Sequence, residues 1–219
     1  MKALVFDTET TGVDVKKVNL TDDTQPYGIQ LAAFLYDLDK IPSPFRPGSI
    51  VPISDLVSFL NYGVEVPQQA YEIHGFNKQF LNEMGLSPTE VLHLFAEMLD
   101  KADVLIGHNI NFDMDILRVA YARDGWSGDP FKDKDTFCTM TESKDILKLK
   151  KRRMQFATDY KKPNLAEAYR FFFKKELDNA HNAAIDAQAS FELFLMLKGA
   201  KAIREIEIDL EDVIRLNAS

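Results

Sequence analysis

Three short segments of the chain carry acidic side chains at spacings that could bind a metal ion or move a proton. The first is Asp7-Thr8-Glu9, whose two carboxylates point to the same side of a strand because strand side chains alternate. Like charges so close disfavour joint ionisation unless a cation or hydrogen-bond donors compensate, and Mg²⁺ prefers carboxylate oxygens. The segment therefore predicts either a metal site or a solvated strand end.

The second acidic segment runs from His108 to Asp113, where a short buried strand ends and a helix starts. Catalytic groups of α/β folds gather at such junctions. Asp115 lies roughly 200° further round the helix axis than Asp113, so the two carboxylates cannot face one target and one of them is predicted to be solvated. Asn109 and Asn111 also suit helix caps, and His108 suits a structural role better than a ligand role.

The third segment places His181 five residues before Asp186. On a continuous helix the two would point apart, but Asn182 suits an N-cap, which would put His181 just before the helix and let the two side chains converge. A histidine beside a carboxylate has the titration range of a general base. The alternative is a capped helix with an incidental acid in its first turn.

A sheet and several helices are needed to bring these segments together, and the hydrophobic pattern predicts both. Residues 2–6 are apolar on both faces, which is typical of a central strand. Ser87-Pro88-Thr89-Glu90 predicts a helix start with a serine N-cap. A three-strand opening followed by alternating helices and strands indicates a mixed-sheet α/β domain. Predicted strands cover residues 2–8, 29–38, 56–61, 103–107 and 135–138, and predicted helices cover residues 77–84, 87–101, 112–124, 164–173 and 183–198.

Length and composition limit the class of protein. A chain of 219 residues with 46% hydrophobic residues fits one large α/β domain or a domain with a modest extension, not two equal domains. No run of eighteen apolar residues is present, so no membrane association is expected. A single cysteine, Cys138, cannot form an internal disulfide, and Asp7 interrupts the first apolar run too early for a signal peptide. We expect a cytoplasmic location.

The charge is distributed unevenly along the chain. The net charge is -8, which argues against a protein that coats nucleic acid nonspecifically. Residues 144–162, however, hold eight basic and two acidic side chains, a local charge of +6, so the remainder carries -14. This basic stretch predicts contacts with the phosphates of a polyanion, and the alternative is a solvated charged face. Its densest part consists of Lys150, Lys151, Arg152 and Arg153.

Taken together, the three acidic segments resemble the motifs of the DnaQ-like 3'-to-5' exonucleases of the DEDD superfamily. Asp7-Thr8-Glu9 matches the first motif, Asp-x-Glu; His108 to Asp113 matches the second, His-Asn-x-x-Phe-Asp; and His181 to Asp186 matches the third, His-x4-Asp. Ile73-His74-Gly75-Phe76 and Asp135-Thr136 resemble two smaller family segments. A histidine in the third motif, in place of tyrosine, indicates the histidine-type branch. The resemblance covers residues 1–198 and leaves residues 199–219 as a C-terminal extension of unknown role.

The resemblance implies a fold, a reaction and a set of cofactors. The fold is α/β, a ribonuclease-H-like mixed central sheet flanked by helices. The reaction is metal-dependent removal of nucleoside 5'-monophosphates from the 3' ends of DNA, with single-stranded DNA preferred, by a two-metal-ion mechanism. Two divalent cations, Mg²⁺ or Mn²⁺, would be held by Asp7, Glu9, Asp113 and Asp186, and His181 would take the proton.

The resemblance also implies contacts with the substrate. The backbone around the first motif would hold the 3' nucleotide, Val13 would pack against its base, and His74 would lie near it, unless His74 is only a surface cap. The expected substrate-binding residues are Thr8, Thr10, Thr11, Gly12, Val13, His74, Asn109 and Phe112. Three features depart from the family's motif set: a polar insertion at residues 15–26, the basic stretch, and an alternating tail at residues 203–210.

Several alternatives stay open at this point. An exoribonuclease of the same superfamily would use the same carboxylates, because the chemistry does not require the 2'-hydroxyl. A noncatalytic nucleic-acid-binding module is a rival class, although such modules usually lack one of the acids. Proofreading, DNA repair and phage-encoded trimming all fit the motifs. The expected partner is nucleic acid, DNA in preference to RNA, and the tail could dock a polymerase or another replication protein.

Overall fold

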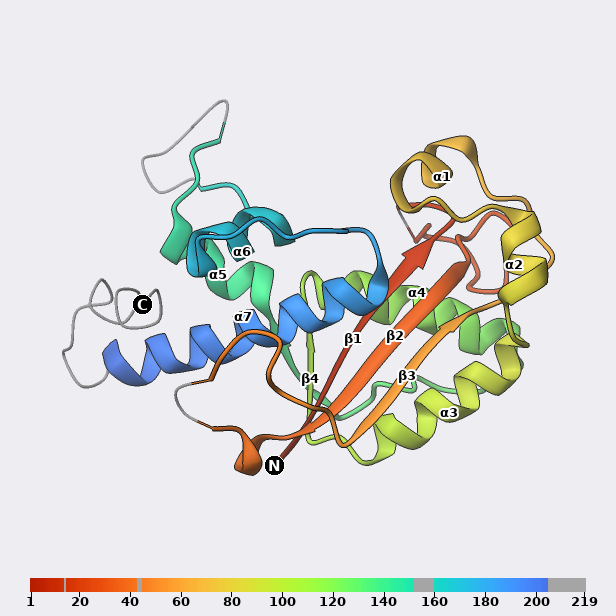
Figure 1. Cartoon of the computed structure of the whole chain (residues 1–219). Helices are drawn as coiled ribbons and strands as arrows, with labels where there is room; N and C mark the ends of the chain where they lie inside the picture. The colour runs from red at the N-terminus through yellow and green to blue at the C-terminus, as the bar shows by residue number, and fades with distance from the viewer. Residues whose placement is uncertain (14, 43–44, 152–159, 205–219) are drawn as a thin grey trace.

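The computed structural model describes residues 1–13, 15–42, 45–151 and 160–204 (Figure 1). A five-stranded sheet has the strand order β3-β2-β1-β4-β5. β1 pairs with β2, and β2 with β3, in antiparallel fashion, whereas the pairs β1–β4 and β4–β5 are parallel. The prediction of a mixed central sheet is confirmed. The strands are β1 (Lys2–Thr10), β2 (Gly28–Asp37), β3 (Ser54–Phe59), β4 (Val104–Gly107) and β5 (Asp135–Cys138).

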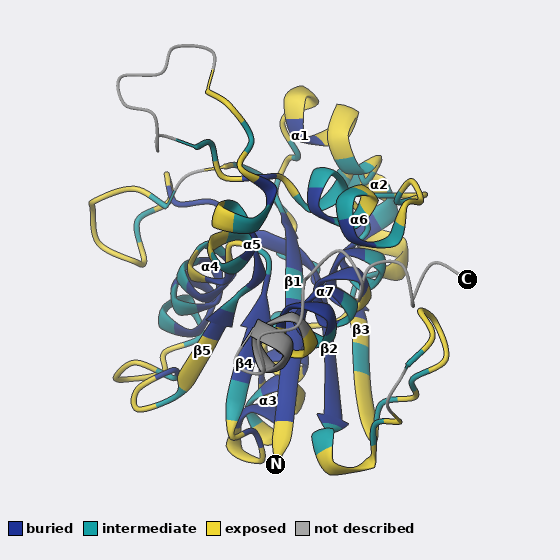
Figure 2. Ribbon diagram, turned by 90° about the vertical axis from the view of Figure 1, so that its left-hand side faces the viewer, coloured by how far each residue is buried: buried dark blue, intermediate teal, exposed yellow. Residues whose placement is uncertain are grey.

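Helices cover both faces of the sheet because β1 is apolar on both sides. Leu4 and Phe6 enter one hydrophobic core with side chains of α3 and α4, while Ala3 and Val5 enter a second core with side chains of α6 and α7. Figure 2 shows β1 and β2 buried along most of their length. The helices are α1 (Gln68–His74), α2 (Lys78–Met84), α3 (Pro88–Asp100), α4 (Ile110–Arg123), α5 (Thr139–Leu147), α6 (Leu165–Phe173) and α7 (Ala183–Arg204), with a short 3-10 turn η1 (Leu38–Lys40).

The predicted strands and helices are all present, and the structure adds two helices. The sequence did not predict α1, of seven residues, or α5, of nine residues. Ser87 occupies the N-cap position of α3, as predicted, but its side chain makes no capping hydrogen bond; its carbonyl accepts the first helical bond, from Val91 N. Asn164 forms the capping box, with Glu167.

The turn from β4 into α4 is tight, and this sets the start of the second acidic segment. A Cβ on Gly107 would lie 3.1 Å from the Cβ of Ile110, so a side chain there would push the helix away from the strand. Asn109 adopts a left-handed conformation, with φ 70°, to complete the turn. The parallel strands β1 and β4 therefore deliver their acidic segments to the same edge of the sheet.

The C-terminal region is described only in part. α7 continues past the expected domain boundary at residue 198 as far as Arg204. Most of the alternating tail at residues 203–210 lies outside the described residues, and so do Arg152 and Arg153 of the basic stretch. Within the part of the chain that the structure describes, no helix combines the length and the apolar character needed to cross a bilayer.

Candidate active site

Four acidic side chains from three elements meet at the end of β1. Asp7 and Glu9 lie at the end of this strand, Asp113 lies in the first turn of α4, and Asp186 lies in the first turn of α7. Their charges act on one another: burial raises the pKa of Asp7, and Asp113, Asp186 and Glu9 all raise it further. The structure therefore brings together all four carboxylates that the motifs singled out.

Asp113 is fixed to β1 by two hydrogen bonds. Its Oδ1 accepts from the backbone N of Thr8 at 2.9 Å and from the Thr8 hydroxyl at 2.7 Å. The carboxylate is buried, and these bonds link the start of α4 directly to the first motif. Thr8 is one of the expected substrate-binding residues, and the structure also gives it the role of holding Asp113 in place.

Asp186 is placed by the start of α7. Asn182 accepts a hydrogen bond from Ala184 N at 3.1 Å, as expected of a capping residue, and the helix begins after it. The Oδ2 atom of Asp186 accepts from the backbone N of His181 at 3.1 Å, while its buried Oδ1 has no partner among the described residues. Gln30 of β2 holds the same helix start by accepting from Ala183 N at 3.0 Å.

His181 projects beside the carboxylates in an exposed position. Its backbone is left-handed, with φ 67°, which turns the chain into α7 and directs the imidazole back toward β1. A ring nitrogen of His181 and carboxylate oxygens of Glu9 and Asp186 lie within 4.8 Å of one another. The convergence of His181 with Asp186, one of the two interpretations of the third segment, is what the structure contains.

Burial and mutual repulsion make the four carboxyl groups hard to ionise together. Burial, followed by the charges of Asp186 and Asp113, raises the pKa of Glu9 to about 8. Burial raises the pKa of Asp113 to about 7 despite the Thr8 hydrogen bonds, and burial also raises the pKa of Asp186. A bound cation would offset this repulsion.

The donor set fits divalent metal ions. All four acids supply oxygen, the ligand type that Mg²⁺ and Mn²⁺ prefer. The buried and unpartnered Oδ1 of Asp186 is an acceptor that lacks a donor among the described residues, which is the situation of a ligand atom without its ion. The expected metal-binding residues Asp7, Glu9, Asp113 and Asp186 are thus consistent with a site for cations.

A cavity of about 310 Å³ opens next to these acids. Its walls come from the end of β1, the loop that follows, α1, and the first turn of α4. Val13 and Ile73 are 73% and 50% exposed and give the cavity an apolar rim. The lining residues are Thr8, Glu9, Thr10, Thr11, Gly12, Val13, Pro67, Gln69, Ala70, Ile73, His74, Phe112 and His181.

His74 lines this cavity on a support of aromatic rings. Its Nδ1 accepts from Phe76 N at 3.1 Å, and its ring stacks on Phe76 at 5.2 Å. Phe76 in turn contacts Phe59 and Phe80. Burial lowers the pKa of His74. The histidine is therefore part of the cavity wall as well as the last residue of α1.

Two residues of the second segment do not enter the cavity. Asn109 occupies the N-cap position of α4 but makes no capping bond, and it does not line the cavity. His108 contacts the Thr139 hydroxyl at 2.9 Å and the Pro163 carbonyl at 3.0 Å, and burial lowers its pKa to about 4. This geometry agrees with the expected structural role of His108. The predicted substrate contact of Asn109 stays a prediction.

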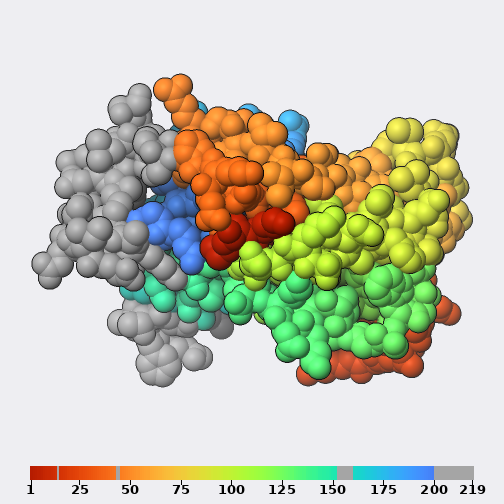
Figure 3. Space-filling model, turned by 90° about the horizontal axis from the view of Figure 1, so that it is seen from below, coloured from red at the N-terminus to blue at the C-terminus, as the bar shows by residue number. Residues whose placement is uncertain are grey.

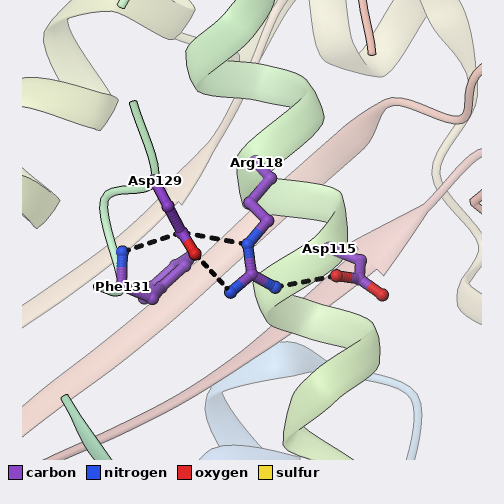
Figure 4. A network of polar contacts seen from close by, with 4 residues as sticks. All are labelled: Asp115, Arg118, Asp129 and Phe131. Atoms are coloured by element: carbon purple, nitrogen blue, oxygen red, sulfur yellow. Dashed lines mark hydrogen bonds and ion pairs between the residues drawn. The ribbon is translucent and has the colours of Figure 1, made fainter. Parts of the chain in front are cut away.

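Asp115 points away from the acidic cluster, which agrees with the prediction that Asp113 and Asp115 cannot face one target. It pairs with Arg118 at 2.8 Å, and Arg118 also binds Asp129 through two nitrogens at 3.0 Å (Figure 4). Asp115 is about half exposed, whereas Asp113 is buried. The two acids of α4 thus divide into one for the site and one for a surface ion-pair network.

The sequence did not single out several residues of the site. Pro67, Gln69, Ala70 and Ile73 line the cavity from α1 and the residue before it, which the hydrophobic pattern did not reveal. The only available signal was their position at or just before the Ile73-His74-Gly75-Phe76 segment. Gln30 was also missed, because a lone glutamine on a buried strand has no distinctive pattern.

Comparisons with known proteins agree with this geometry. A family model described as exonuclease, RNase_T, matches residues 4–194. No curated protein sequence matches the chain. Exonuclease I from E. coli, in complex with a dT13 oligonucleotide, has a similar structure, with a TM-score of 0.63 and 17% identity over 93% of this chain. Exonuclease I from Methylocaldum szegediense gives a TM-score of 0.60 and 19% identity over 95% of this chain.

The similarity covers only part of those proteins. This chain spans 41% of each of the two exonuclease I chains. At these identities the structural match shows a shared fold, the ribonuclease-H-like arrangement of a mixed sheet between helices, and the family match shows the family.

Proposed function

We propose a function from one premise: the chain belongs to the RNase_T exonuclease family, the DnaQ-like 3'-to-5' exonucleases, which hydrolyse phosphodiesters. The chain removes nucleoside 5'-monophosphates one at a time from the 3' ends of DNA, and it prefers single strands. The observation that carries this proposal is the meeting of Asp7, Glu9, Asp113 and Asp186 beside a cavity of about 310 Å³.

Two divalent cations fit the proposed reaction. Asp7, Glu9 and Asp186 would hold them, with Asp113 helping directly or through water. When bound, such ions lower the pKa of an attacking water and stabilise the charge on the leaving oxygen of an in-line displacement. Mg²⁺ and Mn²⁺ both suit a set of carboxylate ligands.

His181 is the proposed general base. It is exposed, its ring lies within 4.8 Å of Glu9 and Asp186, and its bond to Asp186 comes from the backbone N rather than from the imidazole. The imidazole would accept a proton from the attacking water as the new bond from water oxygen to phosphorus forms. The bond from phosphorus to the 3'-oxygen of the shortened chain breaks, and that oxygen leaves.

The cavity supplies the proposed binding site for the terminal nucleotide. Thr8, Thr10, Thr11 and Gly12 present backbone and hydroxyl groups to its sugar and phosphate. Apolar side chains contact the base, and such contacts accept any of the four bases because every base has an apolar face. The apolar contacts come from Val13, Ile73 and Phe112.

DNA is the proposed substrate because of the oligonucleotides bound in similar structures. The similar exonuclease I structures include complexes with dT13 and dA16 oligonucleotides. The carboxylates themselves do not distinguish DNA from RNA. Detection of a faster exoribonuclease activity would therefore change the proposed substrate from DNA to RNA. A proofreading or repair role, a polymerase partner bound by residues 199–219, and a cytoplasmic location stay predictions.

The basic stretch is the proposed binding site for the phosphates of the strand upstream of the cleaved bond. Lys150 and Lys151 are exposed. The backbone of Lys150 forms an isolated antiparallel β-bridge with that of Tyr160. A chain with a net charge of -8 needs a local positive surface to hold a polyanion. Replacing Lys150, Lys151, Arg152 and Arg153 together should flatten the salt dependence of binding by roughly 0.7 in log-log slope per lost phosphate contact. An unchanged slope of the salt dependence would contradict this phosphate contact.

A degradation assay tests the proposed function. End-labelled single-stranded DNA, duplex DNA, RNA and circular single-stranded DNA are incubated with the protein, with and without Mg²⁺ or Mn²⁺. We expect mononucleotides from the 3' end of the linear single strand, only with metal, and no attack on circles. Rapid loss of circles, or release from the 5' end first, would refute the proposal, and faster release from RNA would favour the exoribonuclease.

A further inference from the structure

The wall between the cavity and its surroundings is thin at Thr11, Gly12 and Val13. A second cavity, of about 430 Å³, also borders these three residues and shares them, together with Pro67, with the first cavity. Because these residues border two cavities, core packing does not fix this wall. Something outside the core has to hold it, if the cavity is to keep one shape.

The polar insertion at residues 15–26 supports this wall. Thr11 N donates to the Tyr27 carbonyl at 2.9 Å, and Tyr27 N donates to the Thr11 hydroxyl at 2.9 Å, so the two ends of the insertion are tied together. A Cβ on Gly12 would lie 3.6 Å from the Cβ of Pro26, which is ordinary contact distance. The position of the insertion therefore sets the position of the wall.

Gln25 holds the insertion from within. Its side chain is 2% exposed. Its Oε1 accepts from Lys16 N at 2.8 Å, and its Nε2 donates to the Lys16 carbonyl at 2.9 Å. These bonds make the insertion a folded unit rather than a loose loop, but they do not attach it to the rest of the protein.

Arg123 attaches the insertion to α4. Its guanidinium donates to the carbonyls of Asp22, Gln25 and Pro26 at 3.0, 2.9 and 2.9 Å. The same group stacks on the Tyr27 ring at 3.7 Å. A planar guanidinium can serve several carbonyls and a ring at once, which a lysine ammonium cannot do. Figure 3 shows the orange-red atoms of the insertion against the green atoms of α4 and the loop after it.

α4 thereby connects the wall to the acidic cluster. Its first turn carries Phe112, which lines the cavity, and Asp113, which belongs to the cluster; Arg123 is its last residue. A helix is a rigid rod, with a rise of about 1.5 Å per residue, so its two ends keep a constant separation. One element thus sets both the carboxylates and the wall that faces them.

We propose that Arg123 is a positioning residue that, through the insertion, fixes the Thr11–Val13 wall and so the base and sugar of the 3'-terminal nucleotide. The inference rests on the proposed exonuclease function. Arg123 touches neither the acids nor the cavity, so its loss weakens substrate binding and leaves the chemical step nearly intact. Its signature is a rise in KM without a matching fall in kcat.

Arg118 supplies a matched control on the same helix. It makes its own ion pairs, with Asp115 and Asp129, and lies 5.3 Å from the Phe131 ring (Figure 4). Removing either arginine therefore costs polar contacts and a ring contact near α4. Of the two, Arg123 is the one that contacts the insertion. A loss of general helix stability would affect both variants, whereas the proposed role affects one.

The experiment compares Arg123→Ala, Arg123→Lys, Gln25→Ala and Arg118→Ala with the parent chain. The substrates are the p-nitrophenyl ester of thymidine 5'-monophosphate, which presents a single nucleotide, and a labelled single strand of about 20 nucleotides. We expect both Arg123 variants and Gln25→Ala to raise KM for the ester by roughly tenfold, with kcat changed by less than about threefold. Arg118→Ala should leave both constants unchanged.

Limited trypsin digestion gives a readout that does not depend on activity. Lys16 and Lys17 in the insertion are exposed, and cleavage after them should accelerate in Arg123→Ala but not in Arg118→Ala. An unchanged KM in an active Arg123→Ala, an equal rise in Arg118→Ala, or full rescue by Arg123→Lys would overturn the inference. If Arg123→Ala does not fold, Gln25→Ala decides by the same criteria. A parent chain that hydrolyses neither substrate would instead refute the proposed function.

Discussion

The acidic cluster and the cavity wall lie side by side but are built in different ways. Asp113 and Asp186 are buried, and the elements that carry the cluster, β1, α4 and α7, pack into the two hydrophobic cores. The cavity wall as a whole comes mainly from α1 and from the loop after β1, which includes Thr11–Val13. Val13 and Ile73 in these segments are largely exposed. Figure 2 shows α1 mostly exposed above the buried strands.

This difference reflects how precisely the side chains of each region must be positioned. Metal-assisted hydrolysis requires ligands held within a fraction of an ångström, which packed cores provide. Contact with a base tolerates small shifts, so short helices and loops suffice for it. Changes in the cluster should therefore abolish the reaction, whereas changes in the wall should alter substrate affinity.

The largest effect is expected from Asp7→Ala or Asp186→Ala. Loss of a metal ligand should remove about 4 kcal/mol of transition-state stabilisation, a fall of roughly a thousandfold in kcat on labelled single-stranded DNA with Mg²⁺. Asp115→Ala is the matched control, since this acid lies on the surface of α4 and binds Arg118. Near-normal turnover by either cluster variant would remove the distinction between cluster and wall.

His181→Ala should have the next largest effect. Loss of a general base typically costs about 10²- to 10⁴-fold in rate, and here metal binding should persist because the carboxylates are unchanged. Calorimetric measurement of Mn²⁺ binding distinguishes the role of general base from that of metal ligand. His93→Ala, an exposed histidine on α3, is the control. A His181 variant that no longer binds Mn²⁺ would show that the imidazole is a ligand rather than a base.

Ile73→Ala probes the wall. Removing part of an exposed apolar side chain should weaken contact with the base and raise KM by about three- to tenfold, with little change in kcat. Leu94→Ala, at a similarly exposed position on α3, should change neither. Steady-state kinetics on a labelled single strand measures both constants. A fall in kcat without a change in KM would place Ile73 with the cluster.

The smallest effect concerns the stability of the metal-free protein. The folded-state pKa of Glu9, about 8, lies above the ordinary value of 4.5, so the folded state holds this proton more tightly than the unfolded state. Its contribution to stability is complete below about pH 4.5 and is lost as the pH rises through 8. Glu9→Gln should therefore raise Tm by a few degrees at about pH 9. It should also reduce the decrease in Tm that occurs as the pH rises from about 5 to 9.

Thermal unfolding in EDTA across this pH range checks the prediction, with Mg²⁺ added in a parallel series. In the parent chain the metal should restore Tm at about pH 9, because a cation offsets the same repulsion that protonation relieves. A variant that loses as much stability as the parent between about pH 5 and 9 would mean that Glu9 does not experience the repulsion of the cluster.

The sequence by itself determined most of the elements and the identity of the acids. Alternation in residues 2–9 placed Asp7 and Glu9 on one side of β1, and Asn182 correctly indicated the start of α7. Helical geometry alone predicts that Asp113 and Asp115 face different targets. These are local matters, since a strand period of two and a helix period of about 3.6 depend only on neighbouring residues.

Tertiary structure decided how these side chains are held together and which other residues surround them. The motif resemblance assigns Asp113 to the site, and the structure shows how it is held there: its Oδ1 accepts two hydrogen bonds from Thr8, 105 positions away in the chain. It also brought α1 over the cavity and tied the insertion to α4 through Arg123. Such contacts join segments far apart in the chain, and they depend on the packing of whole elements. No local pattern of residue types carries that information.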